Sequence, residues 1–224
     1  MYKSVTVNGE AGVKATCLLH SVAPTGVPMV TFEIEYPRII LAEINTHRML
    51  AKSSASSRAI PFEKMTKQLI GRPVRFGKAN KGMQDTGEQH DGKVIIRGYE
   101  MSGQEAWEFA KESAVEISDA FYKAGFAKQV YNRLTEPFQM IKTVISGTEW
   151  ANFFWLRYHE SADPTFAELA RCMYEALMAS TPQQLMPGEW HLPYIITRRN
   201  EYGDIEYWLD EFAQLNEEDA LIAS

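Results

Sequence analysis

The pattern of hydrophobic and polar residues near the N-terminus predicts a sheet. Residues 3–8 and 12–22 are rich in Val, Thr and Leu, and the turn formers Asn8 and Gly9 separate them, so we expect two strands. Residues 29–36, MVTFEIEY, place an apolar side chain at every second position, which is typical of a half-buried strand.

The period changes to a helical one after the third predicted strand. From Arg38 to about Leu50, apolar residues recur three and four positions apart, so we expect a buried helix that begins after Pro37. The basic pair His47-Arg48 would lie at the C-terminal end of this helix, where the helix dipole favours a positive charge.

Helices dominate the prediction for the second half of the chain. A helix from Ser102 to Ala124 would begin with a capping box, because Glu105 stands three residues after Ser102, and would end at Gly125. Its apolar stripe would be Trp107, Ala110, Ala114, Ile117 and Phe121. We also expect a short helix at 127–134, a strand at 140–145, helices at 148–156 and 165–179, and an acidic helical tail at 206–221.

Two segments are predicted to be loops. Residues 71–98 hold six of the 14 glycines, and a loop of this length in a compact domain is usually functional or mobile. Its stretch GKANKGMQ lacks the Lys-Ser/Thr pair of a phosphate loop, which disfavours that interpretation. In residues 187–194, PGEWHLPY, two prolines frame Trp190 and His191, and a structural loop under a core tryptophan is favoured over a ligand site.

The order of these elements predicts an α+β fold. We expect a mixed or antiparallel sheet packed with helices, in one domain over residues 1–224, because no repeat, low-complexity tract or linker interrupts the chain. Of the 224 residues 45% are hydrophobic, which is enough for a sizeable core.

Charge and composition narrow the function classes. A net charge of −6 argues against a general nucleic-acid binder, although it leaves room for a local basic pocket. Cys17 and Cys172 form no disulfide framework, and the five scattered histidines have no metal-ligand spacing. Neither a signal core nor a membrane span is present in the sequence, so we expect a soluble, cytoplasmic protein with no metal and no membrane partner.

The stretch THRMLAKSSASSRA, residues 46–59, is the first candidate for chemistry. It combines small residues, hydroxyls and the cations Arg48, Lys52 and Arg58. Serine with arginine is a common set for binding phosphate, and Arg58 can make a two-pronged contact that lysine cannot copy. A solvated loop after a helix is the alternative that the residues alone leave open.

The stretch EWANFFWLRYHE, residues 149–160, is the second candidate. Asn152 and Arg157 are polar groups on a strongly apolar helix, and a buried arginine needs a partner. A ligand can supply that partner, but so can Glu149 or Glu160. Neither stretch names a reaction by itself, because we find no nucleophile with a base, no carboxylate pair and no metal set.

Both stretches resemble motifs of the flavin-dependent thymidylate synthases. That family carries R-H-R-x7-S followed by an arginine, and this chain reads Thr46-His47-Arg48, seven residues, then SSR at 56–58. Its NFFWLR, residues 152–157, resembles the family's N-F-x-x-L-R helix. Order and intervals agree over roughly residues 12–180, and the remainder resembles a divergent branch associated with phages.

The resemblance implies reductive methylation of dUMP at C5 to give dTMP. It implies a mixed α/β fold and a homotetramer with active sites between subunits. FAD would carry the hydride, a reduced nicotinamide cofactor such as NADPH would supply it, and 5,10-methylenetetrahydrofolate would supply the carbon. A phage-encoded enzyme of this kind would act in the host cytoplasm.

The resemblance also assigns residues. Flavin contacts fall on six positions, His47, Arg48, Ser146, Gly147, Thr148 and Asn152. The nucleotide phosphate falls on Ser56, Ser57 and Arg58. Arg157 would contact the pyrimidine and stabilise negative charge on the ring, which makes it the candidate catalytic residue.

Four departures from the family pattern keep alternatives open. Thr46 replaces the first motif arginine, Ser54 stands where the family often has glutamate, and residues 23–26 replace its usual flavin segment. A second phosphate arginine near Met140 is absent, although Lys142 is close. The alternatives are a pyrimidine nucleotide hydroxymethylase, an enzyme for a dCMP-like base, and a flavin- or nucleotide-binding protein without catalysis.

Overall fold

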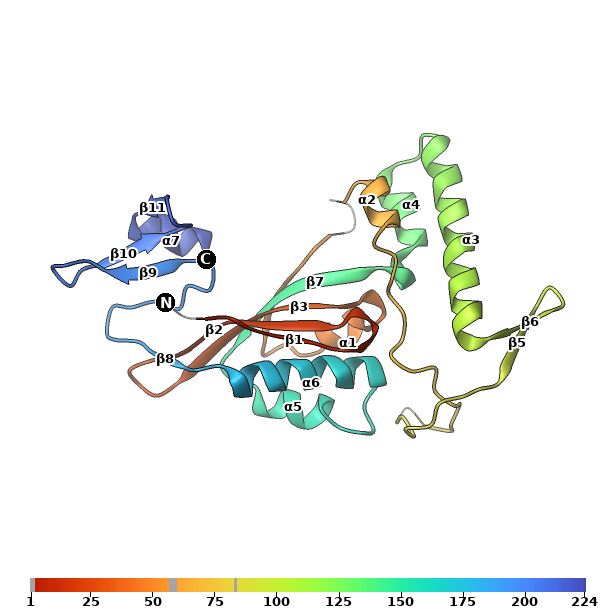
Figure 1. The fold of residues 1–224 in the computed structure, drawn as a ribbon, viewed down its shortest axis with the longest axis horizontal. Coiled ribbons are helices and arrows are strands. Elements are labelled where there is room, and N and C mark those ends of the chain that lie inside the picture. The colour runs from red at the N-terminus through yellow and green to blue at the C-terminus, as the bar shows by residue number, and fades with distance from the viewer. Residues whose placement is uncertain (1–2, 57–59, 83) are drawn as a thin grey trace.

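The computed structural model describes residues 3–56, 60–82 and 84–224 (Figure 1). Two of the predicted phosphate-binding residues, Ser57 and Arg58, lie outside the described residues. The elements form a mixed α+β architecture with antiparallel sheets, as the sequence predicts.

The central sheet contains the four strands that the sequence predicted. Its order is β1-β2-β3-β7-β4, and all of these pairs are antiparallel. The short β8 pairs with β2 in parallel, which makes the sheet mixed. The strand bounds are β1 Val5–Asn8, β2 Lys14–Val22, β3 Pro28–Pro37, β4 Ala51–Ser54, β7 Met140–Gly147 and β8 Gln183–Gln184.

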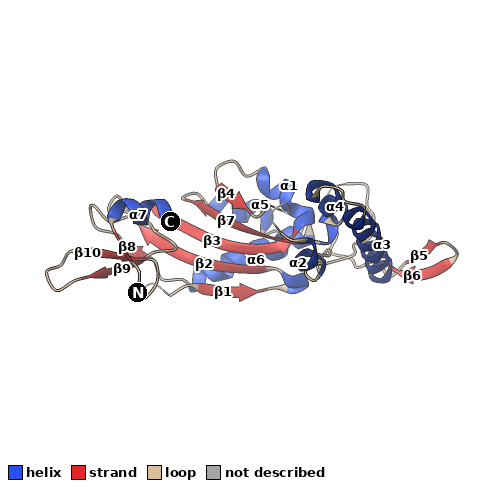
Figure 2. Cartoon of the chain, turned by 90° about the horizontal axis from the view of Figure 1, so that it is seen from above, coloured by secondary structure: helices blue, strands red, loops and turns tan. Residues whose placement is uncertain are grey.

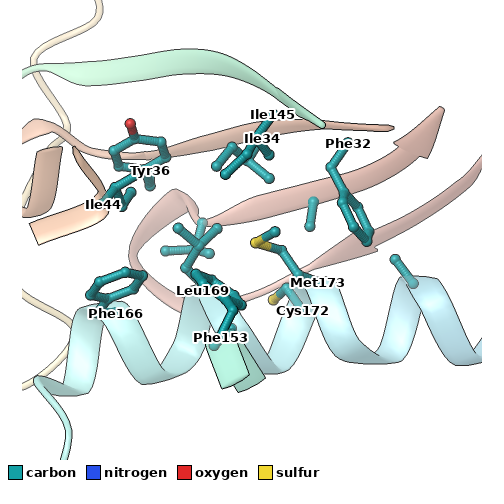
Figure 3. Close-up of a cluster of buried hydrophobic side chains, with 14 of the residues drawn as sticks. Phe32, Ile34, Tyr36, Ile44, Ile145, Phe153, Phe166, Leu169, Cys172 and Met173 are labelled. Atoms are coloured by element: carbon teal, nitrogen blue, oxygen red, sulfur yellow. The ribbon is translucent and has the colours of Figure 1, made fainter. Parts of the chain in front are cut away.

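Two helices cover one face of this sheet and build the main core (Figure 3). Helix α6 (Pro164–Ala179) turns the predicted apolar stripe towards the strands, and α5 (Ala151–Arg157) packs against α6. Phe32 and Ile34 from β3 meet Phe166 and Leu169 from α6, and none of these four side chains is more than 1% exposed. Burying side chains of this size stabilises the fold by about 1.5–3 kcal/mol each.

A bulge in β2 inverts which residues face this core. Cys17 pairs with Phe32, but the register shifts after it, so that Leu19 pairs with Thr31. Since neighbouring residues of a strand point to opposite faces, Cys17 and Leu19 lie on opposite faces although they are two positions apart. The end of β2 therefore presents Ser21 to the face that α5 and α6 do not cover.

A second cluster of helices lies beside the sheet. Helix α3 (Gly103–Lys123) packs with α4 (Lys128–Leu134) and α2 (Phe62–Thr66) and stands next to the sheet in Figure 1. The predicted capping box of Ser102 and Glu105 begins α3, and Gly125, with φ +80°, follows its end. The predicted stripe is only half-buried, because Ala110 and Ile117 face outwards.

The predicted helix from Arg38 to Leu50 is too long. A 3-10 turn (η2, Arg38–Ile40) leads into α1 (Leu41–Asn45), which ends five residues earlier than expected. The chain then turns and forms β4, whose backbone pairs with β7. Pairing with a strand about ninety residues away supplies the hydrogen bonds that local helical spacing cannot reveal.

Two further predictions for irregular or helical segments are wrong. The end of the 71–98 loop forms β5 (Lys93–Ile96), which pairs with β6 (Tyr99–Ser102) through a turn with positive φ at Arg97 and Gly98. The predicted helical tail at 206–221 is helical only from Glu217, in α7 (Glu217–Ala223); before that, β10 (Ile205–Trp208) and β11 (Gln214–Leu215) form a small antiparallel sheet with β9 (Ile196–Arg199) (Figures 1 and 2). Two short 3-10 turns complete the elements, η1 at Glu10–Gly12 and η4 at Glu136–Phe138.

Candidate functional site

The structure brings the two motif segments into direct contact. Arg157, the last residue of α5, donates from Nε to Nε2 of His47 over 2.9 Å, although 110 positions separate the residues. The ring of His47 lies edge-on to Phe153 and Phe166, at centroid distances of 5.0 and 5.8 Å. The guanidinium carbon of Arg157 lies 4.7 Å from the centre of the Phe166 ring. Core aromatic residues thus support both members of the pair.

This contact determines the protonation of His47. Arginine has no acceptor, so Nε2 of His47 must accept and the proton of the neutral ring must sit on Nδ1. Burial, with Arg157 and Lys52 nearby, lowers the pKa of His47 to about 4. His47 is therefore neutral at pH 7, which corrects the expectation of a positive charge at a helix end. Arg157 finds its partner in His47 rather than in Glu149 or Glu160.

Lys52 holds the turn between α1 and β4 in place. Its ammonium donates to the carbonyl oxygen of His47 and, over 3.0 Å, to that of Leu50. Burial lowers the pKa of this ammonium. The stretch that follows α1 is thus a turn and an edge strand as far as Ser54, although the strand residues other than Lys52 are exposed.

The end of β7 lies beside this turn. Ala51 pairs with Ser146, and a Cβ added to Gly147 would lie 2.5 Å from a methyl group of Leu50. The close approach explains why glycine is needed at this position. Ser146 points to the face opposite the core, where its hydroxyl bonds to Thr31 over 2.7 Å.

The remaining flavin candidates lie at the surface. Arg48, Thr148 and Asn152 are all exposed. Of the six predicted flavin positions, the structure therefore places His47, Ser146 and Gly147 around the β4–β7 junction and leaves the other three on the outside. We find no hydrogen bond from the side chains of Arg48 and Asn152 to any described residue.

Two residues that depart from the family pattern have structural partners. The hydroxyl of Thr46 donates to the carbonyl oxygen of Glu43 over 2.6 Å and closes α1. Ser54 bonds to Thr143 over 2.8 Å, and Thr143 bonds in turn to the phenol of buried Tyr36 over 2.8 Å. Serine at position 54 thus joins a hydroxyl network inside the sheet.

A cavity of about 360 Å³ borders the serine segment. Ala55 and Ile60, which flank residues 56–59, line it together with the cations Arg38, Lys67 and Lys142. Arg38 pairs with Glu136 at 3.1 Å and Lys142 with Glu33 at 3.0 Å, while Lys67 is exposed. Sequence analysis missed Arg38 and Lys67, since no motif marks them and only the fold brings them together.

The 187–194 loop differs from its prediction. Trp190 is 49% exposed, and its indole donates to Glu217 over 2.8 Å, so it is not a core tryptophan. His191 is only partly exposed and bonds to Ser21 and Thr31 on the sheet. Burial, with His20 nearby, lowers the pKa of His191 to about 4.

The described ranges contain neither a metal-binding cluster nor a helix that could span a membrane. No three or more His, Cys, Asp or Glu side chains gather there in a way that suits a metal ion. In the same ranges, every helix is too short or too polar to cross a bilayer.

Comparisons with known proteins give weak structural similarity and no match in sequence. No family model matches the chain, and no curated protein matches it. Among solved structures, the chain is similar to a UMP/dUMP methylase, PolB from Streptomyces cacaoi, bound with 5-Br dUMP. The TM-score is 0.44 at 15% identity, over 68% of this chain and 65% of that one. This similarity assigns neither a family nor a substrate to the present chain.

The two neutral histidines predict a loss of stability in mild acid. Their pKa values of about 4 lie below the usual 6.5, so the unfolded chain binds more protons between these values. Stability is therefore complete above pH 6.5 and falls as the pH drops towards 4. Urea unfolding at pH 7.5 and pH 5 should show a lower midpoint at pH 5.

The variant His47→Gln tests whether protonation of His47 contributes to this loss of stability at low pH. It should lose less stability between the two pH values than the wild type does, because one of the two protonation sites is gone. The control is His90→Gln, at an exposed position in the glycine-rich loop, which should behave like wild type. An unchanged pH dependence in His47→Gln would contradict the assignment.

Proposed function

We propose that this protein catalyses the flavin- and folate-dependent reductive methylation of dUMP at C5 to give dTMP. The observation that carries the proposal is the contact between Arg157 and His47, because it joins the two motif segments that resemble the flavin-dependent thymidylate synthases. Nothing in the local sequence requires residues 110 positions apart to meet.

The residues around this contact suit FAD. The Nδ1–H of His47 and the side chains of Arg48 and Asn152 are hydrogen-bond donors, and they make no side-chain contact with another described residue at these atoms. Such donors match the carbonyl, ring nitrogen and phosphate groups of a flavin nucleotide. When bound, FAD would take a hydride from NADPH and pass it on to the carbon that methylenetetrahydrofolate provides.

Arg157 is suited to activate the pyrimidine. Its Nε is occupied by His47 and its plane lies over Phe166, so both contacts hold the guanidinium in one orientation. The two terminal nitrogens remain to contact a ligand edge in a two-pronged manner. A fixed cation there would stabilise negative charge on the ring and make C5 a better nucleophile. Because His47 is neutral, it does not compete for that charge.

The nucleotide phosphate fits the serine segment and the cavity next to it. Ser56 follows Ala55, which lines the cavity, and the cavity carries the cation Lys67 at its rim. In this proposal Ser56, Ser57 and Arg58 hold the phosphate, and Lys142 stands near the place of the family's second arginine. Mixed hydroxyl and cationic groups are a common phosphate-binding set.

Exposed apolar side chains support assembly with further copies of the chain. Ile117 and Tyr122 on α3, Phe126 in the turn, and Val130 and Leu134 on α4 are each 39–54% exposed. The resemblance to the flavin-dependent thymidylate synthases further implies active sites between subunits. We therefore propose a homotetramer with active sites between subunits.

The substitution Arg157→Lys tests the mechanism. Lysine keeps the charge but loses the planar contact, so dTMP formation should fall at least about tenfold, mainly in kcat. Flavin reduction by NADPH should stay near the wild-type rate, because that step does not need the pyrimidine. The two rates are measured on one preparation, with products of dUMP and dCMP analysed by mass spectrometry.

A matched control is Arg171→Lys on α6, where the arginine pairs with Glu168 and Glu175 away from the motif segments. It should retain both rates. Normal dTMP formation in Arg157→Lys would reduce Arg157 to a structural residue. A hydroxymethyl product or a preference for dCMP would replace dTMP synthesis with the corresponding alternative, and wild-type protein that never takes up FAD would leave only nucleotide binding.

The substitution Arg58→Ala tests the phosphate site. A lost hydrogen bond to a charged group costs about 1.5–3 kcal/mol, which weakens dUMP binding roughly ten- to a hundred-fold. Flavin content should change little. Calorimetric titration with dUMP measures the affinity, and Lys64→Ala on α2, an exposed cation outside the cavity lining, serves as the control. Equal dUMP affinities for Arg58→Ala and the wild type would exclude the phosphate role.

The substitution Ile117→Glu tests assembly. A charge in the centre of the exposed α3–α4 face should shift the protein towards smaller species in sedimentation velocity and lower its flavin content. Ile95→Glu, at a 75% exposed position of the β5–β6 hairpin, should leave the wild-type species unchanged. A wild-type monomer that holds FAD tightly would contradict the intersubunit site.

A further inference from the structure

A row of hydroxyl groups crosses the central sheet on the face opposite to α5 and α6. Thr31 of β3 pairs directly with Ser146 of β7, and their hydroxyls lie 2.7 Å apart. Ser21 reaches the same face because of the bulge in β2. Ser21 is fully buried and Thr31 is 1% exposed, so neither hydroxyl can rely on bulk water for a partner.

His191 connects the members of this row. Its Nδ1 lies 2.6 Å from the hydroxyl of Ser21, and its Nε2 lies 2.9 Å from that of Thr31. A neutral imidazole has one donor and one acceptor nitrogen, so the ring must accept from one hydroxyl and donate to the other. If Nε2 accepts, Thr31 must donate to it and only Ser146 can donate in the Thr31–Ser146 bond; if Nε2–H donates, the hydrogen of Thr31 becomes available to Ser146.

The two contact distances favour one of these directions. Hydrogen bonds donated by hydroxyls are shorter than those donated by N–H groups, with typical lengths of about 2.7–2.8 Å and 2.9–3.0 Å. The 2.6 Å contact thus has Ser21 donating to Nδ1, and the 2.9 Å contact has Nε2–H donating to Thr31. Thr31 then gives its own hydrogen to Ser146. The hydrogen of Ser146 is left to donate outwards.

We propose that His191 is a positioning residue that, through Thr31, makes the Ser146 hydroxyl a hydrogen-bond donor towards its ligand. The inference rests on the proposed function, in which Ser146 belongs to the flavin-binding residues. A flavin ring presents carbonyl oxygens and ring nitrogens as acceptors, which need a donor from the protein. With the opposite tautomer, Ser146 would donate to Thr31 and offer only lone pairs.

The loop that carries His191 has other anchors on the protein. The segment before the loop is tied to the central sheet, because β8 pairs with β2 and the backbone N–H of Leu185 donates to the carbonyl oxygen of Val22 over 2.9 Å. After His191, Leu192 and Ile195 are buried in the apolar cluster of the C-terminal sheet. The loop can therefore remain docked when His191 is replaced, which makes the role testable by substitution. Burial also keeps the ring neutral at pH 7, because the pKa is lowered to about 4.

The first measurement needs no flavin. Nitrogen-15 NMR of the histidine rings at pH 7 distinguishes the two tautomers, and we expect protonated Nε2 for His191. Protonated Nδ1 would overturn the proposal. The His191 resonances are identified by their absence in the variant His191→Gln. The side-chain amide nitrogen of the glutamine reaches the position that Nε2 occupies in the histidine.

The second measurement follows FAD binding and the visible spectrum of the bound flavin. Thr31→Val, which keeps the shape but removes the relay, should weaken FAD binding roughly three- to tenfold, as for one neutral hydrogen bond, and shift the spectrum as Ser146→Ala does. The double variant should be no weaker than Ser146→Ala. Thr31→Ser and His191→Gln, which can still donate to the next member of the row, should retain most of the affinity.

Ser180→Ala is the matched control. Ser180 bonds to Nδ1 of His20 over 2.9 Å, a similar part-buried pair that does not lead to Ser146, and its removal should leave the spectrum unchanged. Wild-type FAD binding in Thr31→Val, with weaker binding in Ser146→Ala, would overturn the relay and leave the proposed function standing. If no variant or wild type binds FAD, the proposed function fails, and the tautomer measurement still decides the relay.

Discussion

Burial of one sheet face against α6 is the constraint on which the rest of the structure depends. Phe166 is fully buried in this layer, and it contacts Phe153 of α5 and the ring of His47. Truncating a buried phenylalanine costs about 3–5 kcal/mol, whereas a single hydrogen bond that involves a charged group contributes about 1.5–3 kcal/mol. Packing therefore decides where α5 ends, and the hydrogen bond from Arg157 to His47 adjusts a geometry that the aromatic residues already impose.

The same packing sets the charge of the candidate site. His47 is buried beside Arg157 and Lys52, and each of these effects disfavours a protonated ring. A neutral histidine can accept from Arg157, which leaves the arginine as the fixed positive group. Arg157 thus carries the positive charge of the pair while His47 stays neutral, because a second positive charge in this place would repel the first.

The face of the sheet opposite to α6 is polar around β2, β3 and β7. It carries hydroxyls at Ser21, Thr31 and Ser146 in place of an apolar layer, and the loop at His191 covers part of it. One bulge after Cys17 produces this arrangement, since it moves Ser21 to the face of Thr31. The β4–β7 junction, around which His47, Ser146 and Gly147 lie, borders both the core face and the polar face of the sheet.

Local patterns in the sequence predicted those helices and strands whose formation depends on neighbouring residues. Alternation identified β2 and β3, and the capping box and apolar spacing identified α3 and α6, since each pattern reports which face of one segment is buried. The motif residues pointed to His47, Ser146 and Arg157 as candidates. Tertiary structure alone decided that β4 is a strand, that the first part of the acidic tail pairs in a sheet, and that Trp190 faces outwards. These outcomes depend on pairing and packing partners far along the chain. The contact of Arg157 with His47 and the relay from His191 to Ser146 have the same origin, because the hydrogen-bonding partner of a buried polar group is chosen by the fold and leaves no periodic trace in the sequence.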